Sequence, residues 1–532
     1  MNASLHAAPD LQREIPAGVL NAPQALAQVT AQWDSDIVQQ ISNYIAIPAK
    51  SPMFDSDWAQ HGFIDTVMRN AASWVEAQKV EGLKLEIVRL EGRTPVLFFE
   101  IPASSGGAGA SPLHQPGPQD RLRRTAGAAS PSGGSEPREA GSVGATVLMY
   151  GHLDKQPEFT GWRSDLGPWT PKYEDGKLYG RGGADDGYAV YASIAAVQAL
   201  KAQKVPHPRI VGLIETSEES GSYDLLPYVN ALRERLGEVA LVVCLDSGAG
   251  NYDQLWLTTS LRGNAAGVLK VEVLTEGVHS GDASGLVPSS FRIMRQVLDR
   301  LEDSKTGRLL PQSFHCAIPA DRLAQAQDTA KILGEEIYKR FPWAHYDCEG
   351  STSFALPTTI DPVEALLNRT WRPTLSVTGA EGFPAFKDAG NVLRPYSAFK
   401  LSLRLPPLVD AGAAVRELKA LLEDNAPYQA KVTFEGGGGA NGWNAPATRP
   451  WFENALNDAS QSFFGAPCGT MGQGGTIPLM SMLSQGFPKA QMMVCGVLGP
   501  KSNAHGPNEF LNVPYAKKLT AAVAHVMARV PG

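Results

Sequence analysis

The sequence TVLMYGHLD, residues 146–154, decides the fold, because a run of strand-forming apolar residues ends directly on an imidazole and a carboxylate. Two further apolar runs end in a similar way. Residues 210–214 run into Glu-Thr-Ser-Glu-Glu at 215–219, and residues 240–245 run into Asp246. Buried parallel strands consist of nearly continuous Val, Ile and Leu, and ligands of open α/β sheets bind beyond the carboxyl ends of the strands. The sequence therefore predicts a sheet rim on which a histidine and several carboxylates meet, as in a metal site.

The segment from 146 to 245 alternates strand-like runs with a helical stretch over 187–202. This order predicts an α/β fold with a doubly wound, mostly parallel sheet. The Asp185-Asp186 pair precedes the helix, and either carboxylate could cap its first turn. The elements expected upstream are a helix over 34–47, closed by Pro48, and strands over 83–90 and 95–101.

After Arg262-Gly263 the pattern changes to that of a smaller α+β (ferredoxin-like) domain inserted in the larger one. Its expected elements are strands over 265–274, 398–405 and 430–434 and helices over 288–301, with Pro288 in the first turn, and 411–422. The glycine run 436–439 would be the hinge back, and 450–529 would add helices and a strand over 491–497. We therefore expect the larger domain to comprise 1–261 and 436–532, and the inserted domain to comprise 262–435.

Residues 103–144 are rich in Gly, Ser, Ala and Pro and cannot bury enough apolar surface to offset their ordering entropy. We expect a disordered surface insertion between two strands. Its Arg121, Arg123 and Arg124 could touch an acidic partner or form a nucleic-acid arm, but a solvated loop is the interpretation that we favour.

The composition excludes several classes of function. The 532 residues suggest two or more domains, and 43% hydrophobic with 19% charged residues is typical of a soluble globular protein. A formal net charge of -7 provides no basic field for nucleic acid or anionic membranes. No membrane span or signal sequence is evident, so we expect a cytoplasmic protein. The five cysteines are scattered and never form a CxxC pair, which argues against a disulfide framework.

The residues at the predicted rim suit metal-assisted hydrolysis. His152 is a possible zinc ligand whose tautomer Asp154 could fix. Of the adjacent Glu218 and Glu219, one could bind metal while the other stays free as a base. The turn GRGGADDG, 180–187, carries two carboxylates that would repel phosphate. A serine nucleophile is disfavoured because no GxSxG motif is present.

Together these motifs resemble the zinc-dependent peptidase family that includes carnosinase, bacterial glutamate carboxypeptidase, aminoacylase and succinyl-diaminopimelate desuccinylase. The resemblance covers nearly the whole chain outside the N-terminal stretch and the insertion. The motifs, in family order, are GHLD at 151–154, GRGGADD at 180–186, EES at 218–220, Asp246, HSG at 279–281 and HGPNE at 505–509. The aspartate at 246, in place of a glutamate, resembles the dipeptidase and tripeptidase branches.

The resemblance implies two bound divalent metal ions, expected to be zinc, with manganese or cobalt as alternatives. The metal ligands that it implies are His152, Asp185 as the bridge, Glu219, Asp246 and His505. The other roles that it implies are Glu218 as general base, Asp154 as the partner of His152, His279 as an oxyanion donor that reaches across a dimer, and Arg404, Gly475 and Thr476 as the groups that receive the substrate carboxylate. The inserted domain would then be the lid and the homodimer interface. One departure from the family is Gly187, where a lysine is usual.

We therefore expect metal-dependent hydrolysis of the amide bond in dipeptides or short peptides, with neither nucleic acid nor membrane as a partner. An N-acyl amino acid or the C-terminal residue of a longer peptide is the alternative substrate for the same site. A non-catalytic metal-binding scaffold is a more distant alternative, and it would be marked by loss of Glu218 or of a ligand, none of which is lost.

Overall fold

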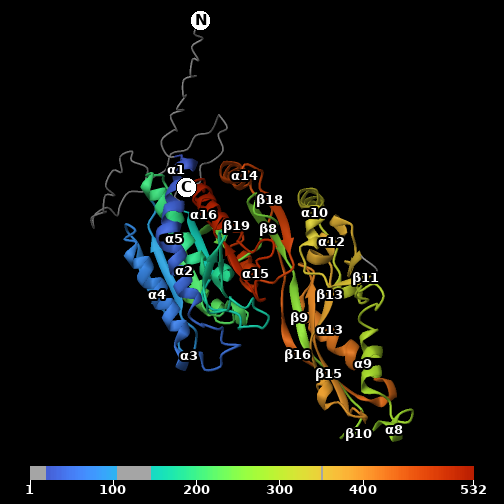
Figure 1. Ribbon diagram of the computed structural model, residues 1–532. Coiled ribbons are helices and arrows are strands. Elements are labelled where there is room, and N and C mark those ends of the chain that lie inside the picture. The colour runs from blue at the N-terminus through green and yellow to red at the C-terminus, as the bar shows by residue number, and fades with distance from the viewer. Residues whose placement is uncertain (1–18, 105–144, 349–350, 532) are drawn as a thin grey trace, which may run out of the picture.

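The computed structural model describes residues 19–104, 145–348 and 351–531, and Figure 1 shows two bodies joined by long strands. The first body contains a six-stranded sheet between layers of helices, and the second contains a four-stranded antiparallel sheet that extends away from the first. Most of the expected insertion, residues 105–144, lies outside the described residues.

The six-stranded sheet has the order β1-β2-β6-β3-β7-β19, and β6, β3, β7 and β19 run parallel. The three apolar runs of the sequence are therefore neighbouring parallel strands, as predicted. From β3 the chain crosses to β6 on one side and then to β7 on the other, so the carboxyl end of β3 lies where the strand order reverses, the usual ligand crevice of such sheets. The strand bounds are β1 Lys84–Val88, β2 Val96–Ile101, β3 Thr146–His152, β6 Arg209–Glu215, β7 Val239–Cys244 and β19 Gln491–Val494.

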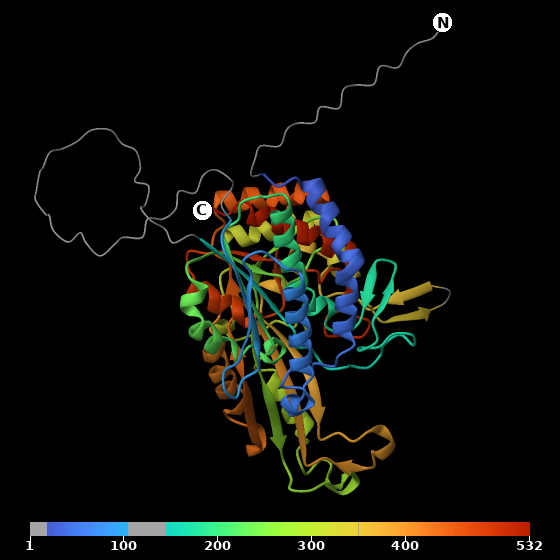
Figure 2. The same ribbon diagram turned by 90° about the vertical axis from the view of Figure 1, so that its left-hand side faces the viewer.

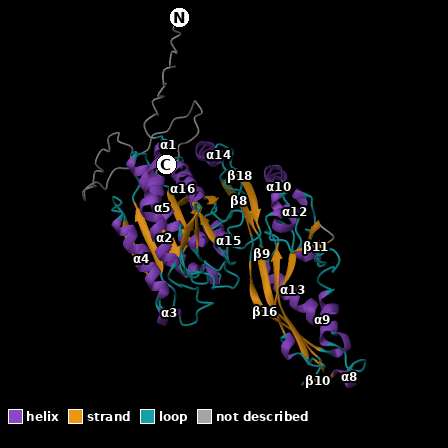
Figure 3. Cartoon of the chain, viewed as in Figure 1, coloured by secondary structure: helices purple, strands orange, loops and turns teal. Residues whose placement is uncertain are grey.

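Helices cover both faces of this sheet, which confirms the doubly wound arrangement (Figure 3). The larger layer, which faces the viewer in Figure 2, consists of α1 Ala22–Gln32, α2 Val38–Ile45, α4 Phe63–Ala77, α5 Ala189–Ala202, α14 Pro450–Phe464 and α16 Val513–Met527. The opposite layer consists of α6 Leu225–Ala231, α7 Arg233–Leu236 and α15 Pro478–Gly486. Almost every residue of α5 is buried, because this helix lies between the sheet and the outer helices.

The second sheet has the order β13-β15-β9-β16 and is antiparallel throughout. Two amphipathic helices pack on it around a separate apolar core. These elements are β9 Gly263–Glu272, α9 Ser290–Leu298, β13 Thr374–Glu381, β15 Tyr396–Leu405, α13 Ala411–Glu423 and β16 Lys431–Ala440. The small elements β10 Val278–His279, α8 Ser280–Ala283 and β14 Val392–Leu393 lie at its far end (Figures 1 and 2).

A three-stranded sheet, β17-β8-β18, connects the two bodies; two helices of the second body pack on it, and a third packs on those two helices. Its strands and helices are β8 Trp256–Leu261, β17 Trp443–Asn444, β18 Gly469–Gln473, α10 Ala320–Leu333, α11 Glu336–Lys339 and α12 Pro362–Thr370. The remaining elements are α3 Trp58–His61, β4 Lys172–Glu174, β5 Lys177–Tyr179, β11 His345–Cys348, β12 Ser351–Phe354 and β20 Phe510–Asn512. No helix in the described ranges has the length and apolar character needed to cross a bilayer.

Two predicted helix starts were wrong. The first helix begins at Ala22, well before 34, because Asn21 accepts a hydrogen bond from the Gln24 amide and a proline occupies the first turn. Its apolar face is thin, with only Ala25 and Val29 buried, so its periodicity is weak. Helix α9 is capped by Ser289, which leaves Pro288 outside the first turn.

Two further predictions about local structure were also wrong. Neither Asp185 nor Asp186 caps α5, whose N-cap is Tyr188 without a side-chain hydrogen bond. The glycine run 436–439 is not a hinge but lies inside β16, with a register shift against β9. Helix α13 packs closely on the strand there, since a Cβ on Gly436 would lie 3.0 Å from Val415 Cγ1.

Helix α16 contains a buried histidine whose ionisation opposes folding. His525 is 5% exposed, and neither ring nitrogen has a hydrogen-bond partner in the described part of the chain. Burial, followed by the nearby Arg529, lowers its pKa from 6.5 to about 4. The unfolded chain therefore takes up this proton first, so the stabilising effect of a neutral His525 is complete above pH 6.5 and is lost as the pH falls towards 4.

We expect the ionisation of this histidine to lower the free energy of unfolding by roughly 3 kcal/mol on full acidification. The measurement is urea unfolding between pH 7 and pH 4.5, with a chelator present so that metal release does not contribute. His525→Leu should lose less stability over this range than the wild type, by about 2–3 kcal/mol. Parallel stability curves for the two proteins would contradict the assignment.

Candidate metal centre

Five chain segments meet beyond the carboxyl ends of β3, β6 and β7. His152 ends β3, and Asp246 follows β7 by two residues. The turn after β6 carries Glu218 and Glu219, and the turn before α5 carries Asp185. The fifth donor segment is distant in sequence: His505 lies in the loop between β19 and β20. The rim predicted from the apolar runs therefore exists, and it is completed from the C-terminal part of the chain.

Asp185 lies between the two histidines and faces one with each carboxylate oxygen. Its Oδ1 is 3.6 Å from His152 Nε2, and its Oδ2 is 2.9 Å from His505 Nε2. Each histidine also has a second carboxylate. Asp246 Oδ2 is 3.8 Å from His152 Nε2, and Glu219 Oε2 is 3.4 Å from His505 Nε2. The donors therefore form two groups that share Asp185, which we call the His152 group and the His505 group.

The orientation of His152 suits a metal ligand. The residue is fully buried, and its Nδ1 lies 3.1 Å from the Asp154 carbonyl oxygen, to which it can donate. That tautomer leaves the lone pair of Nε2 directed at Asp185 and Asp246, and Nε2 has no hydrogen-bond partner among the described residues. Donor atoms of His152, Asp185 and Glu219 lie within 4.8 Å of one another, as do those of His152, Glu218 and Asp246. The donor set therefore fits divalent cations.

The electrostatics of the cluster favour the binding of positive charge. Burial, and then the neighbouring carboxylates, raise the pKa of Glu219 to about 8 and that of Asp246 to about 7. Burial and Asp246 also raise the pKa of Glu218 well above its usual range. The surrounding protein partly desolvates His505, which would lower its pKa, but Glu219 and Asp185 outweigh this effect and raise the pKa to about 10. Bound cations would relieve this repulsion, because they favour the ionised carboxylates.

The carboxylate of Asp154 contacts the turn after β6 more closely than it contacts His152. Its Oδ1 is 3.4 Å from His152 Nδ1. Its two carboxylate oxygens accept hydrogen bonds from the amides of Glu218 at 3.2 Å and Glu219 at 2.9 Å. Asp154 therefore orients both glutamates, a contact that the two-residue spacing from His152 did not reveal.

Sequence reasoning missed Glu215, a second buried carboxylate that supports the same turn. It accepts hydrogen bonds from the hydroxyls of Tyr150 at 2.7 Å, Ser222 at 2.9 Å and Ser217 at 3.0 Å. Burial, and then Asp154, raise its pKa to about 7. The sequence did contain a signal for this role: Glu215 is the last residue of a predicted buried strand, and a serine that could bind its carboxylate follows two residues later.

A cleft of about 240 Å³ joins the donors to the loop that follows β18. Glu218 and Asp246 line one side, and Gly475 and Thr476 line the other. Arg404, on β15, reaches this side and donates from Nη1 to Thr476 Oγ1 at 3.2 Å. The structure thus brings the predicted carboxylate-binding residues to the mouth of the donor cluster, and the volume suits a ligand smaller than drug-sized molecules.

His279 is the one predicted site residue that lies elsewhere. It belongs to β10, at the end of the second sheet that is remote from the six-stranded sheet (Figure 1). Within a single chain, the structure does not bring it to the donor cluster.

Gly187, the departure from the family pattern, has a steric explanation. A Cβ at this position would lie 2.1 Å from the ring of Tyr44, which fills the adjacent space. The same ring lies 3.8 Å from Nζ of the buried Lys155, which donates to the carbonyl oxygens of Tyr44 and Ile47. Tyr44 of α2 therefore fills the space that a side chain at position 187 would need.

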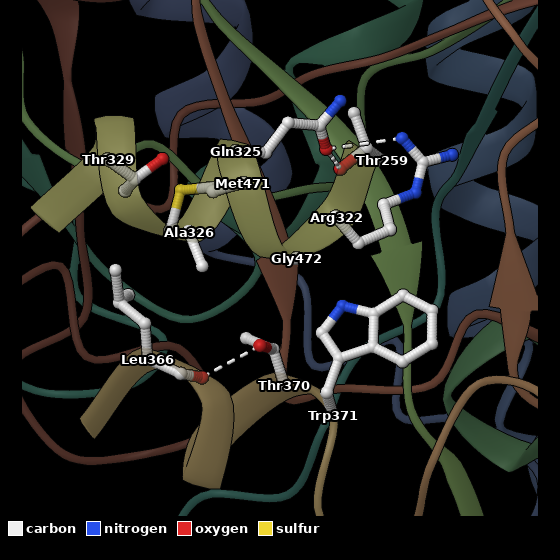
Figure 4. Close-up of a pocket in the computed structure, with 10 residues that line it drawn as sticks. All are labelled: Thr259, Arg322, Gln325, Ala326, Thr329, Leu366, Thr370, Trp371, Met471 and Gly472. Carbon is white, nitrogen blue, oxygen red and sulfur yellow. Dashed lines mark hydrogen bonds between the residues drawn. The ribbon is translucent and has the colours of Figure 1, made fainter. Parts of the chain in front are cut away.

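A second cavity, shown in Figure 4, lies where α10 and α12 pack on β8 and β18. Gln325 accepts hydrogen bonds there from Thr259 and Arg322, and Thr370 donates to the Leu366 carbonyl. Its volume of about 10 Å³ is roughly that of one water, so this cavity is part of the packing between the two bodies and not a substrate site.

A parallel sheet with paired imidazole and carboxylate groups at its strand-order reversal, beside a small cleft, defines the class of metal-dependent hydrolases. Comparison with known proteins names the family. The model of peptidase family M20/M25/M40 matches residues 148–529, and the chain belongs to this family of metallopeptidases.

Similar proteins include dipeptidases. The chain is 29% identical to human Beta-Ala-His dipeptidase over 401 residues, which cover 71% of this chain and 72% of that protein. It is 28% identical to the cysteinylglycine-S-conjugate dipeptidase of Corynebacterium striatum, covering 72% and 80% of the two chains. Among solved structures, human carnosine dipeptidase 1 has a TM-score of 0.70 at 22% identity, covering 96% of this chain and all of that one (100%). This structural likeness confirms the fold.

Proposed function

We propose that this protein hydrolyses the amide bond of dipeptides with the help of two divalent metal ions. The observation that carries the proposal is the pair of imidazole–carboxylate groups that share Asp185 beside a cleft of about 240 Å³. The dipeptidases among the similar proteins support dipeptides as the substrate class.

The two donor groups suggest how the ions would be held. His152 and Asp246 would bind one ion, His505 and Glu219 would bind the other, and Asp185 would bridge them. We propose zinc, because imidazole and carboxylate ligands suit it, with manganese or cobalt as alternatives in a carboxylate-rich site. Such a pair of ions, when bound, supplies the Lewis acidity that polarises an amide carbonyl and makes water acidic.

Of the two adjacent glutamates, Glu218 is better placed to move protons. It lines the cleft, whereas Glu219 contacts His505 and accepts a hydrogen bond from Gln156 at 2.6 Å. Glu218 would take a proton from the attacking water and deliver it to the leaving amine. The Asp154 carboxylate accepts a hydrogen bond from the Glu218 amide and would thereby keep the Glu218 side chain positioned in the cleft.

Arg404, Gly475 and Thr476 would receive the free carboxylate of the substrate. Arg404 is mostly buried and forms no ion pair with any described carboxylate, so its remaining donors are available to a carboxylate ligand. Placing the carboxylate across the cleft from Glu218 would fix the distance to the scissile bond and favour short substrates.

We expect Arg404→Met to raise KM for a free dipeptide by about 10- to 100-fold, because a charge-assisted hydrogen bond is lost. The matched control is the same dipeptide with an amidated C-terminus, on which wild type and variant should differ little. Equal losses on both substrates would place Arg404 outside carboxylate recognition.

We further propose that the second body is the lid and the interface of a homodimer. This body exposes large apolar side chains, which is unusual for a surface that stays in water. They include Leu286 at 85% exposed, Phe386 at 100% and Phe383 at 46%. A second copy that covers this surface could bring its own His279 to the cleft, where an imidazole would stabilise the developing oxyanion.

The test of the proposed function is hydrolysis of a dipeptide panel by protein that is stripped with a chelator and then restored with zinc or manganese. Cleavage of free dipeptides that depends on the added metal supports the proposal. Cleavage of N-acyl amino acids alone, or release of C-terminal residues from longer peptides alone, would change the substrate class but keep the site. Metal binding without hydrolysis of any amide would overturn the proposal.

A further inference from the structure

A buried ion pair lies beside the donor cluster and has no part in the chemistry described above. Arg181 is 1% exposed and Glu509 is 0% exposed, and Arg181 Nη1 donates to Glu509 Oε2 at 2.5 Å. The other oxygen of Glu509, Oε1, accepts a hydrogen bond from the Gly182 amide at 2.8 Å. The pair therefore joins the turn that carries Asp185 to the loop that carries His505.

The rest of the Arg181 guanidinium binds backbone carbonyls of the same loops. Its Nη2 donates to the carbonyl oxygens of His505 and Gly506, both at 3.0 Å, and its Nε donates to Pro157 at 3.1 Å. A planar guanidinium can satisfy several acceptors at once in a fixed geometry, which a lysine cannot do. Arg181 thus holds three loops together and contacts the His505 backbone directly.

The two donor groups differ in how firmly their histidines are held. His152 is the last residue of the central strand β3 and is fully buried. The His505 side chain is 56% exposed, and its residue has a φ of 66°, in the left-handed region. Lys501, Asn503 and Asn508 in the same loop also have positive φ, a conformation that non-glycine residues rarely adopt. Tertiary contacts must hold this loop, because its local conformational preferences do not favour the observed shape.

We propose that Arg181 and Glu509 are positioning residues that hold His505 for the ion of the His505 group, so that their loss weakens one metal site selectively. The inference rests on the proposed function, since it assigns His505 to a metal. The His152 group should be less sensitive to the pair than the His505 group, because His152 is fixed by its strand and by the Asp154 carbonyl, and the groups share only Asp185.

The test is metal binding by Glu509→Gln and Arg181→Lys, measured by calorimetric titration of metal-free protein with zinc and by elemental analysis after dialysis. We expect the wild type to bind two ions. Each variant should bind the first ion with nearly unchanged affinity and the second about 10- to 100-fold more weakly, as is typical when a group that orients a ligand is lost. Activity at low metal should fall and should recover as zinc is raised, with KM for the dipeptide unchanged.

The matched control is Glu100→Gln, which removes a carboxylate that pairs with Arg209 and Arg235 near the amino end of β6. It should leave both ions tightly bound. Equal weakening of both ions in the Arg181 and Glu509 variants would show a general loss of structure and overturn the inference, as would unchanged binding of both. Arg181→Lys keeps the buried charge paired, so it can be measured if Glu509→Gln does not fold.

The two proposals can fail independently. A wild type that binds two ions but cleaves no amide would remove the proposed activity and leave the positioning role intact. A wild type that cleaves dipeptides, with variants whose two sites weaken together, would remove only the positioning role.

Discussion

Glu218→Gln should bind metal as the wild type does and lose about 10²- to 10⁴-fold in kcat, the range that a general base contributes. The substitution keeps the size and the hydrogen-bonding shape of the side chain but removes its ability to accept a proton from water. The backbone position should persist, because the Asp154 carboxylate holds the amides of both glutamates. The measurement is kcat on a free dipeptide, together with metal content by elemental analysis.

The chain offers a matched control in the next residue. Glu219→Gln makes the same chemical change one position along, where the carboxylate contacts His505. It should lower metal affinity, and its activity should depend on added metal. Near-wild-type turnover in Glu218→Gln would exclude this residue as the base, and metal loss in both variants would make Glu218 a ligand.

The second large effect concerns His279, which we expect to act in the active site of the partner subunit. His279→Ala alone should lose about 10²- to 10³-fold in kcat, the cost of one oxyanion donor. Mixing it with Glu218→Gln provides a sharper measurement. In a heterodimer of the two variants, one site would combine an intact Glu218 from one chain with an intact His279 from the other.

Co-expression of the two variants with different affinity tags allows the heterodimer to be purified. It should show about half the activity of the wild-type dimer, because one of two symmetric sites is restored. If His279 acted within its own chain, the heterodimer would be no more active than the better of its two parents. A monomer in solution would also exclude action between subunits, and the exposed Phe386 and Leu286 would then need another explanation.

The sequence was sufficient for the central sheet and most of the donors. The Val, Ile and Leu runs before His152, Glu215 and Asp246 predicted three parallel strands, and the structure confirms them as neighbours β6, β3 and β7. Such runs are informative because a strand covered by helices on both faces must be apolar along its whole length. Because parallel strands end at the same edge of the sheet, the polar residues that follow the three runs must lie near one another.

Local patterns failed where pairing with a distant element decides the conformation, or where a helix buries too few residues to show a clear period. The glycine run 436–439 resembles a hinge in sequence, but it forms part of β16 because it pairs with β9. The start of α1 was missed because only two of its residues are buried. The strand depends on a partner that is distant in sequence, whereas the start of α1 has a local signal, the Asn21 cap, that its weak apolar periodicity obscured.

What the sequence determined by itself was the sheet, its rim and the kinds of donor on that rim, because these depend on periodicity and on residue order along single strands. What only the tertiary structure decided was the arrangement of those donors. Asp185 faces His152 with one oxygen and His505 with the other, and Asp154 binds the glutamate turn as well as its own histidine. The Arg181–Glu509 pair joins residues 328 positions apart in the chain. Such contacts depend on how loops from different strands meet in space, which the spacing of residues along one chain does not specify.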